Sequence, residues 1–388
     1  MRRLVRNIKV LNVGQGDCVV FNGLYDGDKN AKMTIYIDLG PGNVDITKEA
    51  KYNDIDIFLT HHHDDHMGGL RYFIGSQFHR INNIYIPDYR DELTLVAKAI
   101  LNLKGIRSAK DCIEFINELN DIVNNYNFLV SLSKSRHIQV CHQDDIFYGC
   151  MRCLNPPQYL DVYKWIQECD GNELKEMFYT LFEKEFADQF NEYIFGNSNV
   201  FDEEYQILDE NRLFDYEDDN DISRKNYVVD FIMRNRELLM AFHHKPTRKR
   251  LSKIYRQYTK CCHETCLVVR YQEEDFSFLL TGDASKKVFK RLISNNELIY
   301  SQYLKVPHHG SKNNLTSKIL SCINPEVAII SHGNGRFGKA KDSHPNQEIL
   351  DMLIKNKTKI LITNDVIKDG KIIMKKKNHC SDGYIEIK

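Results

Sequence analysis

Apolar and polar residues follow two periodicities that together predict a layered α/β protein. Short runs rich in Val, Ile and Phe, each closed by a turn residue, predict buried strands. These runs lie at Ile8–Val13, Cys18–Phe21, Met33–Ile37, Asp54–Leu59, Ile81–Pro87, Ile138–Leu154, Thr265–Tyr271, Phe276–Leu280, Tyr303–Val306, Val327–His332 and Lys359–Thr363. Apolar residues three and four positions apart predict helices at Leu70–Phe78, twice within 92–130, and from Val288 towards Leu298.

The middle of the chain departs from this pattern and predicts an added module. Residues 161–230 contain 20 acidic and 6 basic side chains, whereas 231–260 contain 1 acidic and 9 basic. The periodicity there is mainly helical. We therefore expect three segments: 1–157 and 259–388 as two halves of one domain, and 158–258 as a helical insertion that offers a surface to a protein partner. The basic run Lys245–Arg250 either contacts phosphates or is a solvated face that answers the acidic part of the insertion.

Composition narrows the class of protein. The chain has 388 residues and a formal net charge of −1, so its overall charge attracts neither nucleic acid nor an acidic membrane. It contains 11 cysteines and no apolar run of about 18 residues, and the residues after Met1–Arg3 do not have the apolar pattern expected of a secretory leader. We expect a cytoplasmic protein with free thiols and no membrane association.

Candidate metal ligands are concentrated in the segment from Thr60 to Gly69, directly after a predicted strand. His61 and His63 stand two residues apart on an extended backbone, so both imidazoles project to one side and His62 to the other. Asp65 and His66 follow, just before glycines that permit a tight turn. Strand context, spacing and glycines all favour a metal site over a solvated histidine-rich loop.

Further ligand-type side chains follow the ends of other predicted strands. They are Asp38, Asp283, His308 and His309, with His344 on a later loop. Functional groups at strand ends of a layered α/β sheet converge on one edge, which is where active sites lie. The sequence therefore predicts one site assembled from distant parts of the chain.

The order of these motifs resembles the metallo-β-lactamase superfamily, and within it the ComEC-type branch, the soluble hydrolase domain of DNA-uptake proteins. The resemblance covers the chain outside about 158–258 and rests on six segments: 13–17, 37–40, 61–69, 279–283, 305–311 and 343–345. It implies an α/β fold, a four-layer αβ/βα sandwich with the mainly helical insertion, and two divalent metal ions, Zn or Mn, at its edge.

The resemblance also implies roles for the candidate residues. His61 and His63 would bind the first ion, Asp65 and His66 the second, and Asp283 would bridge the two, with His309 as a further ligand. Asp38 and Asp17 would support the metal loop by hydrogen bonding. The third histidine of the first ion has no clear match in the sequence, and His137, His142 and His263 remain open.

Two cations at such a site lower the pKa of a shared water and neutralise the oxygens of an in-line displacement. We expect a phosphodiesterase or nuclease that acts on nucleic acid or a nucleotide. Asp65 or Asp283 would orient the attacking hydroxide that bridges the ions. His308 and His344 would stabilise the phosphoryl oxygens or protonate the leaving group, unless they only support other ligands.

Three alternatives stay open. The same fold and metal site also serve other esters, such as a lactone, a thioester or a phosphocholine ester. A non-catalytic module that binds a partner through its insertion is a different class of function. Separately, the segments 150–153 and 261–266, with Cys150, Cys153, Cys261, Cys262, His263 and Cys266, either assemble a structural zinc site or contain buried free thiols.

Overall fold

The computed structural model describes residues 7–25, 32–74, 79–87, 129, 137–157, 259–260, 262–333, 338–339, 342–376 and 383–387. The chain divides into two compact units. The first comprises 1–88, 136–158 and 262–388 and includes nearly all of the described residues. The second comprises 89–135 and 159–261, so the predicted helices within 92–130 and the predicted insertion at 158–258 lie outside the described residues, apart from Leu129.

The first sheet of the larger unit has seven strands, and the four at one end of its spatial order run parallel to one another. In spatial order the strands are β18 (Tyr384–Ile387), β1 (Asn7–Leu11), β2 (Val19–Tyr25), β3 (Lys32–Ile37), β4 (Asp54–Phe58), β5 (Arg80–Pro87) and β6 (His137–Cys141). The antiparallel pairs are β18 with β1, β1 with β2 and β2 with β3. The carboxyl ends of the parallel strands β3 and β4 therefore meet at one edge of the sheet.

The second sheet also has seven strands and also combines parallel and antiparallel pairs. In spatial order they are β15 (Lys359–Ile362), β12 (Val327–Ile330), β11 (Tyr303–Lys305), β10 (Phe276–Leu280), β9 (Val268–Glu273), β8 (Met151–Asn155) and β7 (Ile146–Phe147). The stretch 138–154, predicted as one strand, is divided by turns into β6, β7 and β8. The chain passes there from the first sheet to the second.

The two sheets pack face to face around one apolar core. Alternate residues of β1 to β4 and of β8 to β10 share this core, and the ring of Phe21 lies 5.2 Å from that of Tyr271. Burial of these apolar side chains is the main favourable contribution to folding. The sandwich is thus fixed by side chains that point inward from both sheets.

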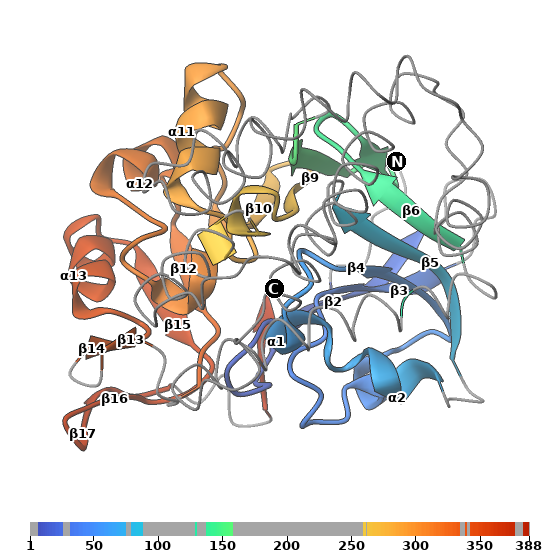
Figure 1. Ribbon diagram of the computed structural model, residues 1–388, viewed down its shortest axis with the longest axis horizontal. Helices are drawn as coiled ribbons and strands as arrows, with labels where there is room; N and C mark the ends of the chain where they lie inside the picture. The colour runs from blue at the N-terminus through green and yellow to red at the C-terminus, as the bar shows by residue number, and fades with distance from the viewer. Residues whose placement is uncertain are drawn as a thin grey trace, which may run out of the picture. The chain divides into compact units, whose positions relative to one another are not determined.

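Helices cover the outer faces of the sheets and complete four layers (Figure 1). The helices α11 (Lys286–Ser294), α12 (Ser317–Ile323) and α13 (Gln347–Lys355) share an apolar cluster with the second sheet. On the first sheet, Phe73 of α2 (Leu70–Ile74) packs edge-on against Tyr36 of β3 at 5.1 Å. The predicted four-layer α/β fold is confirmed.

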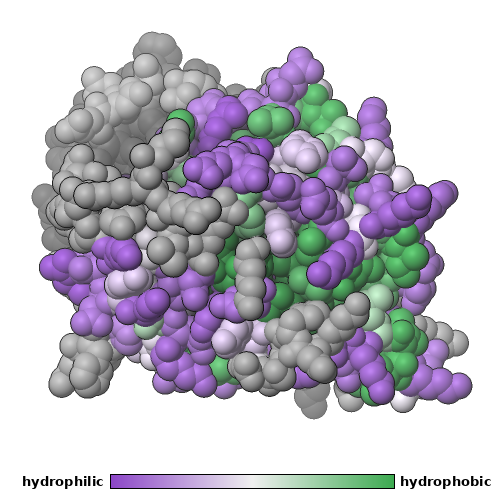
Figure 2. All heavy atoms as spheres, turned by 180° about the vertical axis from the view of Figure 1, so that it is seen from behind, coloured by the Kyte–Doolittle hydropathy of each residue, from purple (hydrophilic) through white to green (hydrophobic). Residues whose placement is uncertain are grey.

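The remaining described elements are short. They are α1 (Asp64–Met67), the 3-10 turns η1 (Thr47–Glu49) and η4 (Pro307–Gly310), and the hairpins β13 (Gly338–Lys339) with β14 (Asp342–Ser343) and β16 (Val366–Lys368) with β17 (Lys371–Met374). Exposed isoleucines lie on the β16–β17 hairpin, and Figure 2 shows apolar patches between hydrophilic side chains on the face opposite to the view in Figure 1. In the described part of the chain, we find no helix with both the length and the apolar character needed to cross a bilayer.

The packing of α11 gives a stability prediction. Phe289 is fully buried against the second sheet, whereas the next residue, Lys290, is exposed. Phe289→Ala should lower the free energy of unfolding by about 3–5 kcal/mol, because it removes apolar contacts and leaves a cavity. Urea unfolding measures this, with Lys290→Ala as the matched control, expected to change the free energy by no more than about 0.5 kcal/mol. Equal effects of the two substitutions would contradict the described packing.

Candidate metal centre

The candidate side chains meet at one edge of the sandwich because each follows a strand that ends there. Asp38 follows β3, the His61–His66 loop follows β4, Asp283 follows β10, and His308 and His309 follow β11. The parallel pairing of β3 with β4 and of β10 with β11 brings these ends together.

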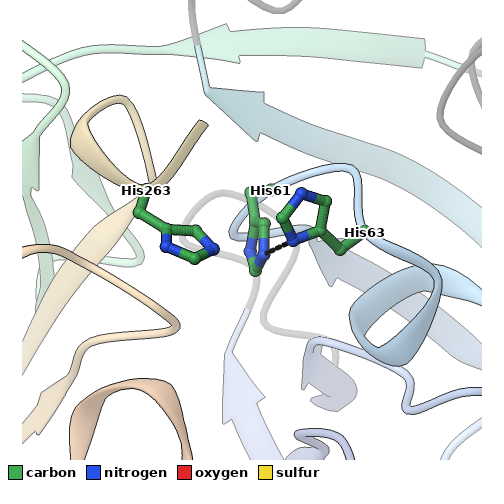
Figure 3. Close-up of side chains that lie close together, drawn as sticks. All are labelled: His61, His63 and His263. Carbon is green, nitrogen blue, oxygen red and sulfur yellow. Dashed lines mark hydrogen bonds between the residues drawn. The ribbon is translucent and has the colours of Figure 1, made fainter. Parts of the chain in front are cut away.

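Three imidazoles form the first ligand group: His61 and His63 from the loop after β4, and His263 from a short helical segment before β9. His61 Nε2 lies 3.0 Å from His63 Nδ1, and the ring of His263 lies 5.5 Å from His61 and 5.3 Å from His63. Figure 3 shows the three rings turned toward one another. One nitrogen of each lies within 4.8 Å of the others, so a single cation can reach all three.

The protonation of these rings suits metal binding. Burial lowers the pKa of His61 and of His263 well below the usual value, and lowers the pKa of His63 to about 4. The rings are therefore neutral at pH 7, the form of imidazole that binds metals. Of the three histidines left open by the sequence, His263 joins the group, whereas His142 lies 3.7 Å from Asp145 and His137 belongs to β6.

Asp65, His66 and His309 form the second ligand group. His309 Nε2 lies 3.3 Å from Asp65 Oδ2, His66 Nε2 lies 3.8 Å from Asp65 Oδ1, and the ligand atoms of all three lie within 4.8 Å of one another. Carboxylate and imidazole together suit Zn²⁺ and also accept Mn²⁺.

Asp283 lies between the two groups and presents one oxygen to each. Its Oδ1 is 3.4 Å from His66 Nε2 and 3.8 Å from His309 Nε2. Its Oδ2 is 3.8 Å from His263 Nε2 and 3.4 Å from His308 Nε2. This is the placement required of a carboxylate that bridges two cations.

The backbone at Gly282 explains why Asp283 follows a glycine. Gly282 has φ +45°, and a Cβ there would lie 2.6 Å from Thr60 Oγ1 and 2.7 Å from Cys266 Sγ. Only glycine combines this left-handed conformation with so close an approach to the metal loop.

Opposite charges hold the second group together. Burial disfavours the charged form of His66, but the carboxylates of Asp65, Asp38 and Asp283 outweigh it and raise the pKa of His66 well above its usual value. Burial likewise opposes the charge on His309, yet Asp283 and Asp17 raise its pKa to about 10. Two imidazolium protons thus balance the carboxylates, and a bound cation would take over that role and release them.

A layer of supporting groups fixes the ring orientations. Asp38 accepts hydrogen bonds from the Thr60 backbone amide, the Thr60 hydroxyl and His66 Nδ1, each at 2.7 Å. His309 Nδ1 donates to the carbonyl of Ser331 at 3.0 Å. Both bonds leave Nε2 of the ring facing the site.

Asp17 lies near the same ring nitrogen of His309 and also forms a buried ion pair. Its Oδ1 lies 3.4 Å from His309 Nδ1 and its Oδ2 lies 2.7 Å from Lys305 Nζ. Lys305 is only 2% exposed. The ammonium group of this lysine is thus buried together with the carboxylate that it pairs with.

His308 is held by Asn314. The Asn314 side-chain amide donates to the carbonyls of Asp283 and Ala284, both at 3.0 Å, so its Oδ1 must face His308 Nδ1 at 3.2 Å. His308 Nδ1 therefore carries the hydrogen and its Nε2 faces Asp283. His308 and His309 both have left-handed backbones, with φ 48° and 51°, and such strain is typical of functional sites.

His344 completes the open side of the site. Its ring lies 5.1 Å from that of His308. Burial, together with the charges of His308 and His309, lowers the pKa of His344 to about 3. The ring is neutral at pH 7.

Buried polar atoms without hydrogen bonds test whether the residues fit a pair of cations. Within the described residues, His66 Nε2, His263 Nε2 and Asp283 Oδ1 are buried and make no hydrogen bond. Leaving such atoms unsatisfied is costly in a protein interior. All three face the two ligand groups, so the donor set fits divalent cations.

The described cysteines are free thiols in different environments. Cys153 lies in the core between the sheets, Cys266 Sγ accepts from the Asp283 amide at 3.3 Å, and Cys262 lies beside His62. The structure does not bring Cys153 and Cys262 into one zinc site.

Comparison with known proteins gives partial matches. No family model matches the chain. ComE operon protein 3 of Bacillus subtilis is 31% identical over 103 residues, which is 26% of this chain and 13% of that protein. Recombination protein 2 of Haemophilus influenzae is 31% identical over 105 residues, 26% of this chain and 12% of that protein. The matches thus span about an eighth of the length of either relative.

Among solved structures, a long form RNase Z from yeast aligns with 96% of this chain and 42% of that chain, at 13% identity and a TM-score of 0.34. A superposition this loose does not by itself establish a common fold. The ordered motifs, the two packed sheets and the gathering of His and Asp side chains at strand ends carry the resemblance instead. In these features the chain resembles the metallo-β-lactamase superfamily and, within it, the ComEC-type proteins.

Proposed function

We propose that this protein is a metal-dependent hydrolase of phosphodiesters, with a nucleic acid or a nucleotide as substrate. The position of Asp283 carries the proposal, since its two oxygens face two separate groups of ligands. In this proposal His61, His63 and His263 would hold one cation, Asp65, His66 and His309 would hold the other, and Asp283 would be within reach of both. Two divalent cations held there would lower the pKa of a water molecule and neutralise the charge of a transferring phosphoryl group.

Three residues on the accessible side have the catalytic roles. The side chains of Asp65 and His308 are 26% and 25% exposed, whereas the remaining proposed ligands are almost fully buried. A substrate approaching from solvent therefore meets Asp65, His308 and His344 first. We assign Asp65 to orienting the attacking water, and His308 and His344 to the phosphoryl oxygens and the leaving group.

The neutral state of His344 fits this role. A neutral imidazole can donate one hydrogen bond to a phosphoryl oxygen without repelling the cations. An approaching phosphate, being anionic, would raise the pKa of this ring and so favour proton uptake before the leaving group departs. His344 can then serve as the proton donor.

Several observations support the choice of substrate and compartment. The name of one relative, Recombination protein 2, supports a nucleic acid. The free thiols of the described cysteines support a reducing compartment, and we place the protein in the cytoplasm. A protein partner bound through 158–258 remains a prediction from sequence, because that segment lies outside the described residues.

The first test is a substrate panel with bis-p-nitrophenyl phosphate, single-stranded DNA, RNA, a cyclic dinucleotide and a lactone. Hydrolysis of a phosphodiester should stop on chelation and return with Zn²⁺ or Mn²⁺. Asp65→Asn and His263→Ala should each lower kcat/KM by about a hundredfold or more, because each removes a proposed ligand. Asp54→Asn, which alters only a surface ion pair with Arg80, is the matched control.

If only the lactone is cleaved, the substrate is another class of ester and not a phosphodiester. Turnover of no substrate, in a protein that binds two metal ions per chain, would favour a non-catalytic binding module. Activity that survives both ligand substitutions would contradict the assignment of the centre.

A second test concerns the orientation of His308. Asn314→Ala removes the acceptor that fixes the His308 ring and should lower kcat about 10- to 100-fold with little change in KM. Asn313→Ala, at the exposed neighbouring amide, is the control. Metal content and the free energy of unfolding are measured beside the kinetics. If Asn314→Ala lowers kcat only in proportion to a loss of bound metal, Asn314 does not act through His308.

A third test uses the lowered pKa of His344. The folded protein keeps this ring neutral down to about pH 3, whereas the unfolded chain binds the proton below its ordinary pKa of about 6.5. Protonation of His344 in the unfolded chain therefore lowers the free energy of unfolding of the wild type as the pH falls from about 6.5 towards 3. Above pH 6.5 this group causes no such loss. His344→Gln should reduce the stability lost between pH 7.5 and pH 5 by about 1–2 kcal/mol, measured by urea unfolding of the chelated protein. An unchanged loss would show that His344 is not held neutral.

A further inference from the structure

His62 has no part in the proposed hydrolytic centre, yet it is buried. It stands between His61 and His63, and the extended backbone turns its ring to the other side of the segment. On that side His62 Nε2 lies 3.4 Å from Cys262 Sγ. Cys262 is fully buried and directly precedes His263.

The same two segments thus present a second donor set beside the first. The ligand atoms of His62, His63 and Cys262 lie within 4.8 Å of one another, as do those of His61, His63 and His263. His63 belongs to both sets and has two ring nitrogens that diverge from one another. Figure 3 shows that the nitrogen of His63 not bonded to His61 points away from it.

We propose that His62, His63 and Cys262 form a site for a thiophilic cation such as Zn²⁺, Cd²⁺ or Cu⁺, next to the proposed hydrolytic centre. One thiolate and two imidazoles are a soft donor set that Mg²⁺, Ca²⁺ and Mn²⁺ do not favour. Binding forms a metal–sulfur bond and releases the proton of the Cys262 thiol to solvent. The inference concerns metal binding and holds whether or not the protein hydrolyses phosphodiesters.

The shared ligand has a consequence for the neighbouring centre. A cation bound by Cys262 and His62 would also bind His63, whose ring is a proposed ligand of the first cation of the hydrolytic centre. The two cations would therefore compete for this ring, or each would change its affinity for the other. Thiophilic metals in excess should therefore weaken binding of that ion. Cys266 offers a matched comparison, because it is an equally buried thiol 3.9 Å from His61 Nδ1 but is already bonded to the Asp283 amide.

The test is a Cd²⁺ titration of the chelated full-length protein, followed by the ultraviolet charge-transfer band of the cadmium–thiolate bond. Wild type should develop one cadmium–sulfur bond per chain. Cys262→Ser should abolish the band and Cys266→Ser should retain it. His62→Gln should keep the band but weaken Cd²⁺ binding by about tenfold or more, because a ligand is lost. Circular dichroism checks that each variant is folded.

Three results would overturn the proposal: no thiolate band in wild type, a band that survives Cys262→Ser, or unchanged Cd²⁺ affinity in His62→Gln. If Cys262→Ser does not fold, the His62→Gln affinity and the Cys266→Ser band decide between the two thiols.

Discussion

The structure depends on the compensation of charge among the carboxylates that are buried at the candidate metal centre. Asp17, Asp38 and Asp283 are each almost completely withdrawn from water, which is costly for a carboxylate without partners. Each has a cationic or hydrogen-bonding neighbour: Lys305 for Asp17, Thr60 and His66 for Asp38, and the surrounding histidines for Asp283. The centre is therefore held by the same interactions that compensate its own burial.

These interactions also connect the two sheets. Asp17 belongs to the turn between β1 and β2 of the first sheet, and Lys305 ends β11 of the second. Close by, the Ser331 hydroxyl donates to the Gly16 carbonyl at 2.6 Å. Thus the residues that position His309 also bind one sheet to the other at the edge where the ligands lie. The geometry of the centre and the packing of the sandwich are mutually dependent.

The sequence predicted the local parts of the site better than its long-range parts. The spacing of His61, His63, Asp65 and His66 fixes their relation within one loop, so strand context sufficed to group them. Asp283 and His309 were predicted because strand ends converge. His263 could not be selected over His137 and His142, because it lies in a short helical segment before β9 and not at a strand end.

Asn314 was not predicted at all, since an asparagine in a polar loop gives no periodic signal. Likewise the division of 138–154 into three strands depends on turns at positive φ, including Asp144 and Tyr148, residues that carry no glycine signal. Fold class was easier to predict than either feature because it follows from many short apolar runs, and errors in single elements do not change the layers.

The ion pair that links the sheets has a consequence for the folding of the protein during its synthesis. The candidate ligands at 61–66 and at 263–309 come together only where both sheets pack against each other and Lys305 pairs with Asp17. A nascent or half-folded chain would therefore lack the complete set of candidate ligands. The hydrolytic activity that we propose would arise only after both sheets have been synthesised and packed together.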